Sequence, residues 1–289
     1  MQKYSMLQSM KIIELVRKKV DMKQFKQRTA LEQDCTTFID FDCIITENGI
    51  PKILYKSLDN EGTKQLRQSV KNIKYQATTR TRGLKTLSRI FGFSQRNPIR
   101  NNFCTSTSLS HEKPKESEII CNYGIEIAKF YEQYFPEVYK IHKDKVDEKM
   151  LKEWTIKETP FTSGIVNKNN PLKYHFDAGN IKGVLSNMVV FKAKTKGGYL
   201  ACPEFDLLFE ASDNTCLLFD GQDILHGVTP IENLSSSSYR YSVVYYTLQQ
   251  MWNCLPYGEE IKRARKMHLK REYDRAEGKT DASLMTFDK

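Results

Sequence analysis

The apolar and polar positions of the chain predict helices in its first half and strands in its second. Apolar residues recur at helical spacing over residues 5–27 and again within 116–155, where Pro136 separates two helices. Over residues 160–250 the pattern changes to short apolar runs separated by turn residues, as in a sandwich or jelly roll. We therefore expect an α+β protein with a double-stranded β-helix core, of the jelly-roll or cupin-like kind, flanked by N-terminal helices and a C-terminal helix.

A hairpin is expected near the N-terminus. Residues 36–45 alternate loosely as in a strand, Asn48-Gly49 is a turn signal, and residues 50–55 return as the second strand. At 289 residues the chain is long enough to bury a full core in one large domain. Over residues 1–289, that domain is expected to comprise an N-terminal helix and hairpin (1–60), a basic segment (62–111), supporting helices (116–155), the jelly-roll core (160–250) and a basic C-terminal helix with its tail (256–289).

Charge gives the first indication of a partner. Lys and Arg number 45 against 35 acidic residues, for a net charge of +10, which favours a polyanion such as nucleic acid, although many basic proteins bind none. Residues 62–111 contain no acidic residue and interleave their Lys and Arg with aromatic side chains, so they could neutralise phosphates and stack on bases. We expect Arg80, Arg82 and Arg89 to contact DNA. The alternative is that the basic stretch is only a solvated face.

The C-terminal segment is a second candidate for such a contact. Residues 259–277 predict a charged helix with few apolar positions and frequent Lys and Arg. This helix is either a solvated end of the protein or a second DNA contact.

Cysteine usage and hydropathy bear on the compartment. The seven cysteines are odd in number and form no C-x-x-C motif, so neither a disulfide framework nor a zinc knuckle is expected. No N-terminal apolar run has the length of a signal peptide, and no segment approaches the length of a membrane span. We expect a soluble protein of a reducing intracellular compartment, without a membrane partner. A nucleus, a nucleoid and a virus-infected cell fit equally, and the oligomeric state stays open.

Candidate chemistry lies in the stretch Tyr174–Asn180. His175 and Asp177 are two residues apart, and residues i and i+2 of an extended strand project to the same face, so both side chains could bind one metal ion. His226, after a β-patterned segment, could supply a third ligand. Two His and one carboxylate on one face of a metal leave the opposite positions open, which suits non-haem Fe(II). Taken alone, a His-X-Asp pair is more often a hydrogen-bonded pair on the surface or in the core, and the succession of His226 and Arg240 favours the metal site.

A permanently charged side chain follows on a later strand. Arg240, Ser242 and Val244 share one face of this expected strand. A guanidinium there can bind a carboxylate through two hydrogen bonds, and the Ser242 hydroxyl can add another. A dicarboxylate cosubstrate, chelating the metal at its other end, needs such a partner. The alternative partner for Arg240 is a surface acid.

These residues carry a resemblance to a known family. Together with Gly198-Tyr199-Leu200, Leu218-Phe219-Asp220 and the segment His226–Pro230, they resemble the motifs of Fe(II)/2-oxoglutarate dioxygenases. Among these enzymes the chain is most similar to the TET/JBP family, which oxidises the methyl group of 5-methylcytosine or thymine in DNA. The resemblance extends over residues 78–250 and includes Ser88–Phe93, which is similar to the N-terminal signature of the family. The cysteine-rich region of animal members is absent, so the similarity is to compact members.

The resemblance implies a hydroxylase. Fe(II) would be held by His175, Asp177 and His226, and 2-oxoglutarate by Arg240 and Ser242, with O₂ as cosubstrate and ascorbate as a reductant. The products would be a hydroxymethyl base, succinate and CO₂, and the base would have to be flipped out of a duplex or single-stranded. Two other classes stay open: a hydroxylase of the same chemistry acting on a protein side chain or small molecule, and a cupin-like binding module without activity.

The resemblance also singles out Asn180, at a position where the family often has an acidic residue near the Watson–Crick edge of the base. An amide carries both a donor and an acceptor, so it could serve either base by flipping. A site for thymine favours the donor, because O4 is an acceptor, and Asn180 therefore favours thymine over 5-methylcytosine. The alternative is that Asn180 only caps the turn after Gly179.

Overall fold

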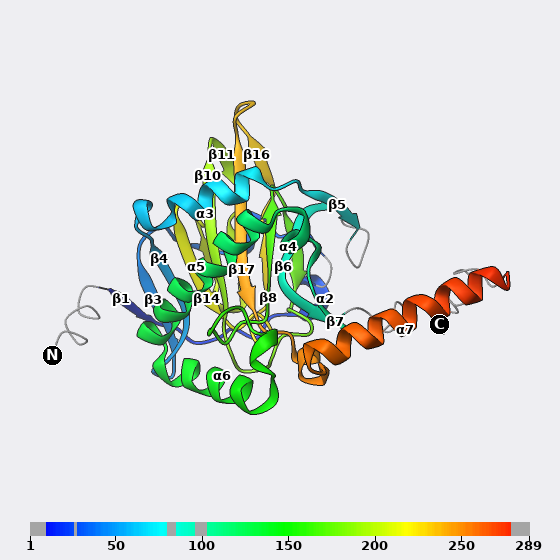
Figure 1. Ribbon diagram of the computed structural model, residues 1–289. Coiled ribbons are helices and arrows are strands. Elements are labelled where there is room, and N and C mark those ends of the chain that lie inside the picture. The colour runs from blue at the N-terminus through cyan, green and yellow to red at the C-terminus, as the bar shows by residue number, and fades with distance from the viewer. Residues whose placement is uncertain (1–9, 26–27, 80–84, 96–102, 279–289) are drawn as a thin grey trace.

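Two β-sheets face each other in the computed structural model of the chain, and helices cover the outer face of the larger sheet (Figure 1). The structure describes residues 10–25, 28–79, 85–95 and 103–278. This architecture confirms the expected α+β class with a β-rich core.

The large sheet runs, within the described residues, in the order β1-β3-β4-β14-β10-β17-β8-β6-β5, with β7 paired to β6. Its first two strands are parallel, and the other pairs are antiparallel. The strands are β1 (Lys11–Glu14), β3 (Cys43–Glu47), β4 (Ile50–Ser57), β5 (Gln76–Thr79), β6 (Lys85–Gln95), β7 (Cys104–Ser106), β8 (Ser163–Lys168), β10 (Ser186–Ala193), β14 (Thr215–Phe219) and β17 (Tyr239–Tyr246).

The small sheet has the order β2-β13-β12-β15-β9, and β11 with β16 forms a separate two-stranded ribbon. The short strands β9 and β15 lie at one edge of this sheet, next to each other. The bounds are β2 (Thr37–Ile39), β9 (Leu172–His175), β11 (Thr195–Gly197), β12 (Leu200–Cys202), β13 (Leu207–Phe209), β15 (His226–Val228) and β16 (Ile231–Asn233).

Alternation along the central strands sends side chains to two separate cores. On β10, Val189 and Phe191 contact the core beneath the helices, whereas Met188 and Val190 contact the core between the sheets. This is the period-two pattern of a strand that is buried on both faces. The central strands are therefore held from both sides, and they form a firm support for side chains at the site.

The helices follow the sequence pattern in the middle of the chain. The long helix α5 packs with α3 against the large sheet, and α6 begins at Pro136, where a residue without an N–H group is tolerated. None of the described helices is both long and apolar enough to cross a membrane. The helical segments are α2 (Met22–Phe25), η1 (Glu32–Asp34), α3 (Asn60–Asn72), α4 (Ser108–Glu112), α5 (Pro114–Tyr134), α6 (Pro136–Lys149), η3 (Lys152–Trp154), η4 (Pro203–Phe205), η5 (Gln249–Asn253) and α7 (Tyr257–Ala276).

The predicted N-terminal helix over residues 5–27 is wrong in the described part of that segment. Strand β1 and the short helix α2 stand there instead. Ile13 and Leu15 pack against the core between the sheets, but Ile12 and Val16 are 60% and 81% exposed, so the apolar positions share no buried helical face. As a strand, the segment pairs its backbone groups with β3 at the sheet edge. The predicted hairpin turn at Asn48-Gly49 and its second strand are confirmed by β3 and β4, but the first strand predicted over residues 36–45 is divided into β2, which pairs with β13, and β3.

The sheets also draw on more of the chain than residues 160–250. Strands β1, β3, β4 and β6 extend the large sheet, and β2 pairs in parallel with β13 in the small one. The basic segment 62–111 is therefore partly built into the frame rather than laid over it.

The expectation that no cysteines pair is wrong for one pair. Cys104, at the start of β7, is disulfide-bonded to Cys254, shortly before α7, with their Cα atoms 5.6 Å apart. A sequence separation of 150 residues hides this proximity from any spacing argument. The other five cysteines are free.

Candidate active site

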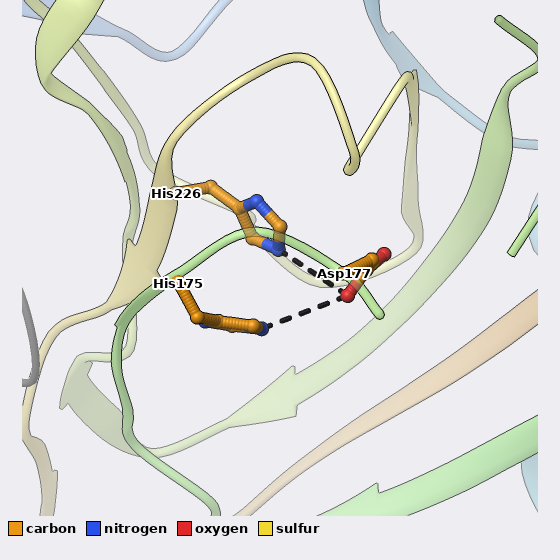
Figure 2. A group of neighbouring side chains, drawn as sticks. All are labelled: His175, Asp177 and His226. Atoms are coloured by element: carbon orange, nitrogen blue, oxygen red, sulfur yellow. Dashed lines mark ion pairs between the residues drawn. The ribbon is translucent and has the colours of Figure 1, made fainter. Parts of the chain in front are cut away.

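Three side chains that can bind a metal converge at the adjoining ends of β9 and β15 (Figure 2). His175 ends β9, His226 begins β15, and the two are direct cross-strand partners with imidazole centroids 4.4 Å apart. Asp177 follows β9, and its Oδ1 lies 3.6 Å from Nε2 of His175 and 3.8 Å from Nε2 of His226. All three ligand atoms lie within 4.8 Å of one another, so the predicted convergence is confirmed.

Backbone carbonyls fix which imidazole nitrogen faces the cluster. Nδ1 of His175 lies 2.8 Å from the carbonyl oxygen of Lys173, and Nδ1 of His226 lies 2.9 Å from that of Ile224. A carbonyl only accepts, so each Nδ1 carries the hydrogen and each Nε2 presents a lone pair. Burial, reinforced by the neighbouring His175, lowers the pKa of His226 to about 4. His226 is therefore neutral at physiological pH, as a metal ligand must be.

The carboxylate of Asp177 is held from behind. The backbone N–H of Asp177 donates to the carbonyl oxygen of Gly221 at 2.8 Å. Nδ2 of Asn180 donates to Oδ2 of Asp177 at 3.3 Å and to Oγ of Ser186 at 3.1 Å. A Cβ atom on Gly221 would lie only 2.3 Å from Oδ2 of Asp177. These contacts engage Oδ2 and leave Oδ1 directed at the two imidazoles.

Arg240, on β17, is a buried charge without a protein counterion. Its side chain is 2% exposed, and Nε and Nη2 have no hydrogen-bond partner among the residues that the structure describes. Burial lowers its pKa to about 10, which still leaves the guanidinium charged at neutral pH. A Cβ atom on Gly198 would lie 2.6 Å from Cδ of Arg240, so only glycine leaves room for this side chain. The alternative of a paired surface acid is thereby excluded within the described chain.

One cavity joins these two features. It has a volume of about 550 Å³ and is lined by His175, Asp177 and His226 together with Arg240 and Ser242. Cavities of this size bind small molecules. A carboxylate that meets Arg240 and a metal held by the three side chains would thus share one cavity.

Comparison with known proteins identifies the family. Residues 91–249, more than half of the chain, match the model of the oxygenase domain of the 2OGFeDO superfamily that is named Tet_JBP. The chain belongs to the TET/JBP family. This superfamily uses Fe(II) and 2-oxoglutarate, so the family membership agrees with the chemistry of the cavity.

Two relatives illustrate the extent of the similarity. The bifunctional helicase and thymine dioxygenase JBP2 of Trypanosoma brucei brucei is 28% identical over 120 residues, which are 42% of this chain and 11% of that protein. The chain thus corresponds to about a tenth of the length of this curated relative. The structure of NgTET1 in complex with 5mC DNA superposes with a TM-score of 0.62 at 15% identity, over 92% of this chain and all of that one. At this identity the superposition shows a shared fold.

The TET/JBP cofactors fit the residues present. Two imidazoles and one carboxylate oxygen form the donor set that suits Fe(II) and leaves positions for other ligands. The buried N–H groups of Arg240 match a carboxylate such as the far end of 2-oxoglutarate. Ser242 lines the same cavity from the same face of β17, and its Oγ accepts from Nδ2 of Asn167 at 3.2 Å. The Ser242 hydroxyl hydrogen therefore remains able to donate to a ligand.

The position of Asn180 changes the expectation for the base. The sequence-based preference for thymine requires that the Asn180 amide can turn its NH₂ group to the base. This NH₂ group instead faces the carboxylate of Asp177, which only accepts, so the amide cannot flip freely. Asn180 does not merely cap a turn either, because its side chain bonds to Asp177 and Ser186 and lines the cavity. The geometry makes it a residue that positions the Asp177 carboxylate.

The expected DNA contact of Arg89 needs correction. Arg89 lies on β6 with 4% exposure, and its Nη2 is 2.9 Å from Oε2 of Glu112 and 3.2 Å from Oγ of Ser108. A guanidinium that is buried and already paired joins β6 to α4 and is not presented to a phosphate. Arg80 and Arg82 lie outside the described residues.

Sequence analysis missed the polar residues behind Arg240 and Asp177. Oδ1 of Asn169 accepts from the backbone N–H of Arg240 at 2.7 Å, and Asn170 donates to Oδ1 of Asn167 at 3.2 Å. The signal was present in the motif Asn169-Asn170-Pro171, but it predicts only a turn. Gly221 was likewise visible only as part of a turn, because its close approach to Asp177 is a tertiary contact.

Replacing Gly221 with Ala is expected to weaken iron binding at least about tenfold, because the added methyl would displace Oδ2 of Asp177. Titration of the metal-free protein with Fe(II) under anaerobic conditions measures this. Gly258→Ala is the matched control, since a Cβ at Gly258 meets nothing within 4 Å. Equal affinities of the two variants would show that Asp177 is not held as described.

Replacing Arg240 with Lys is expected to raise the KM for 2-oxoglutarate at least about tenfold, because an ammonium keeps the charge but loses the two-pronged hydrogen bonding. Succinate production at varied 2-oxoglutarate measures the effect. The exposed Arg275→Lys on α7 serves as the matched control. An unchanged KM would place the cosubstrate carboxylate elsewhere.

Proposed function

We propose that the protein hydroxylates the methyl group of a pyrimidine base in DNA, with 2-oxoglutarate and O₂ as cosubstrates and succinate and CO₂ as coproducts. The observation that carries the proposal is one cavity that combines the His175, Asp177 and His226 cluster with the unpartnered guanidinium of Arg240. One oxygen atom of O₂ enters the methyl group as a hydroxyl, and the other enters succinate. Fe(II), when bound, supplies the oxygen chemistry, and ascorbate serves as a reductant.

The residues of the chain position the reactants. Arg240 and Ser242 bind the distal carboxylate of 2-oxoglutarate and so fix the direction from which its 2-oxo acid end approaches the metal ligands. Asn180 and Gly221 hold Asp177 so that its Oδ1 is directed at the two imidazoles.

DNA as substrate is supported by charge and by the family. The net charge of +10 favours a polyanion, and both relatives carry DNA-modifying names: thymine dioxygenase for one, a complex with 5mC DNA for the other. A methyl group inside a duplex cannot reach the enclosed cavity, so the base is flipped out or taken from a single strand. Ile90 and Phe176, 46% and 38% exposed, line the cavity with apolar surface that an unstacked base could cover.

Between the two methylated pyrimidines we propose 5-methylcytosine. The relatives differ in the base they name, so the polarity of the Asn180 amide is the deciding observation. Its NH₂ hydrogens are directed to Asp177 and Ser186, which leaves Oδ1 as the group that this side chain can offer. An acceptor complements the N4 amino group of cytosine and repels O4 of thymine.

Mass spectrometry of nucleosides tests the function. Matched oligonucleotides that contain 5-methylcytosine, thymine or neither are incubated with enzyme, Fe(II), ascorbate and 2-oxoglutarate. The expected product is 5-hydroxymethylcytosine, with less 5-hydroxymethyluracil. His175→Ala serves as the inactive control. If the wild-type enzyme forms succinate but no modified base, this result would contradict a DNA base as substrate and favour a protein or small molecule.

Asn180→Asp is expected to reduce turnover of both bases by a similar factor, at least about tenfold, because a second carboxylate beside Asp177 repels it and disturbs the metal ligands. The measurement is product formation on the 5-methylcytosine and thymine oligonucleotides in parallel. The ratio of the two activities should stay the same, because Asp keeps an acceptor oxygen where Asn180 offers Oδ1. Full activity with iron affinity intact would contradict the role of Asn180 in holding Asp177.

A further inference from the structure

Helix α7 leaves the body of the protein and extends from it as an arm (Figure 1). Its root is firmly attached: the Cys104–Cys254 disulfide precedes it, and Nε1 of Trp154 donates to the carbonyl oxygen of Leu255 at 2.8 Å. The buried Glu260, in the first turn, accepts a hydrogen bond from the backbone N–H of Leu255. The direction of the arm is therefore set by several contacts at its base.

The exposed part of this arm has one basic face. Successive residues turn by about 100° around a helix, so residues three or four apart project to the same side. One side of α7, which we call the α7 basic face, consists of Lys262, Arg265, Lys266, Leu269, Lys270 and Tyr273. Beyond the first turn this face has no acidic residue within α7. Leu269 and Tyr273 are 67% and 66% exposed, although an isolated solvated helix has no need of apolar side chains.

The cations of this face are not neutralised by the protein. In the described part of the chain, Lys262, Lys266 and Lys270 have no ion-pair partner, whereas Arg263 pairs with Glu260 at 3.8 Å and Arg275 with Glu272 at 3.0 Å. Arg263 and Arg275 lie off the basic face. The helix thus pairs Arg263 and Arg275 with acids of its own and leaves a row of lysines for an external anion.

We propose that the α7 basic face binds the phosphate backbone of the DNA that carries the target base. This inference rests on the proposed function. A helix of 20 residues is about 30 Å long, so the arm could follow about nine base pairs of duplex at 3.4 Å per pair. Each lysine on a phosphate releases a counterion, and the Tyr273 hydroxyl can add a hydrogen bond to a phosphate.

The arm starts close to the catalytic cavity. Leu248 lines the cavity and forms a backbone bridge with Asn180, and η5 then leads directly to the root of α7. A base in the cavity and phosphates on the arm can therefore belong to one DNA molecule, with the arm contacting the flanking backbone.

The distribution of side chains argues for DNA rather than a lipid surface. A helix that lies on a membrane needs an apolar face opposite its polar one. In α7, Leu269 and Tyr273 lie among the lysines, whereas Ile261, Ala264 and Met267 on the opposite side are half-buried and form no exposed apolar face. Charge complementarity without an exposed apolar face is the pattern of a phosphate contact.

The test replaces Lys262, Lys266 and Lys270 together with Gln and measures binding to a 5-methylcytosine duplex by fluorescence anisotropy at several salt concentrations. The salt slope of log K is expected to fall by up to about 2.7, from about 0.9 per lost phosphate contact. The Kd at moderate salt should rise at least about tenfold. The matched control replaces Lys129, Lys140 and Lys143, which removes the same charge from α5 and α6, where Glu126, Asp144 and Asp147 already pair with these lysines.

The outcomes separate this inference from the proposed function. A wild-type protein without salt-dependent duplex affinity would overturn both. If the wild type binds DNA and the arm variant binds as well as the wild type, or no worse than the control variant, only the proposal for the α7 basic face is overturned. Thermal unfolding of both variants checks that they fold. If the arm variant binds phosphatidylserine vesicles more weakly than the wild type but binds the duplex equally well, the α7 basic face is a membrane contact and the proposal is overturned.

Discussion

The structure depends on a buried positive charge that the protein does not neutralise. Arg240 lies in the middle of the large sheet at 2% exposure, with two guanidinium nitrogens unpartnered in the described structure. Burying such a group without a partner costs several kcal/mol, of order 2–7 kcal/mol for a polar group and more for a charge. Asn169 fixes the backbone of Arg240 by accepting from its N–H group, and the absence of a Cβ at Gly198 leaves room for the side chain. We propose that the carboxylate of the cosubstrate is the partner that offsets this cost, which would link the fold to the cosubstrate.

The metal cluster has a different origin, namely strand register. His175 and His226 oppose each other across β9 and β15, so their imidazoles are neighbours as a direct result of pairing. Carbonyl oxygens two residues upstream in each case orient the rings, and Asn180 with Gly221 orients Asp177. Arg240 and Ser242 reach the cavity from the large sheet, and the two histidines reach it from the small sheet. The packing of the two sheets at the core between them thus sets the distance between the two halves of the site.

Features of this protein that depend on residues close together in the sequence could be predicted, and features that depend on contacts between distant segments could not. The face shared by Arg240 and Ser242, the hairpin of β3 and β4, and the spacing of His175 and Asp177 are local, and period-two patterning predicts them. The N-terminal strand β1 was missed, because its apolar residues suggest a helix until β3 offers an edge to pair with. The Cys104–Cys254 bond, the Glu112 partner of Arg89 and the contact of Asn180 with Asp177 all depend on the folded chain. In particular, the role of Asn180 in holding Asp177 depends on the direction of its NH₂ group, which no sequence pattern reveals.

The central claim is that Arg240 is the receptor for the distal carboxylate of 2-oxoglutarate. Calorimetric titration of the Mn(II)-loaded protein with 2-oxoglutarate and with 2-oxopentanoate, which has a methyl group in place of that carboxylate, tests it most directly. The wild-type protein is expected to prefer 2-oxoglutarate by at least about 100-fold, since charge-assisted hydrogen bonds contribute about 1.5–3 kcal/mol each. In Arg240→Met this preference should nearly vanish, while the ligand-free variant unfolds at a temperature no lower than the wild type, because a buried unpaired charge has been removed. An Arg240→Met protein that kept the full preference for 2-oxoglutarate would contradict the account.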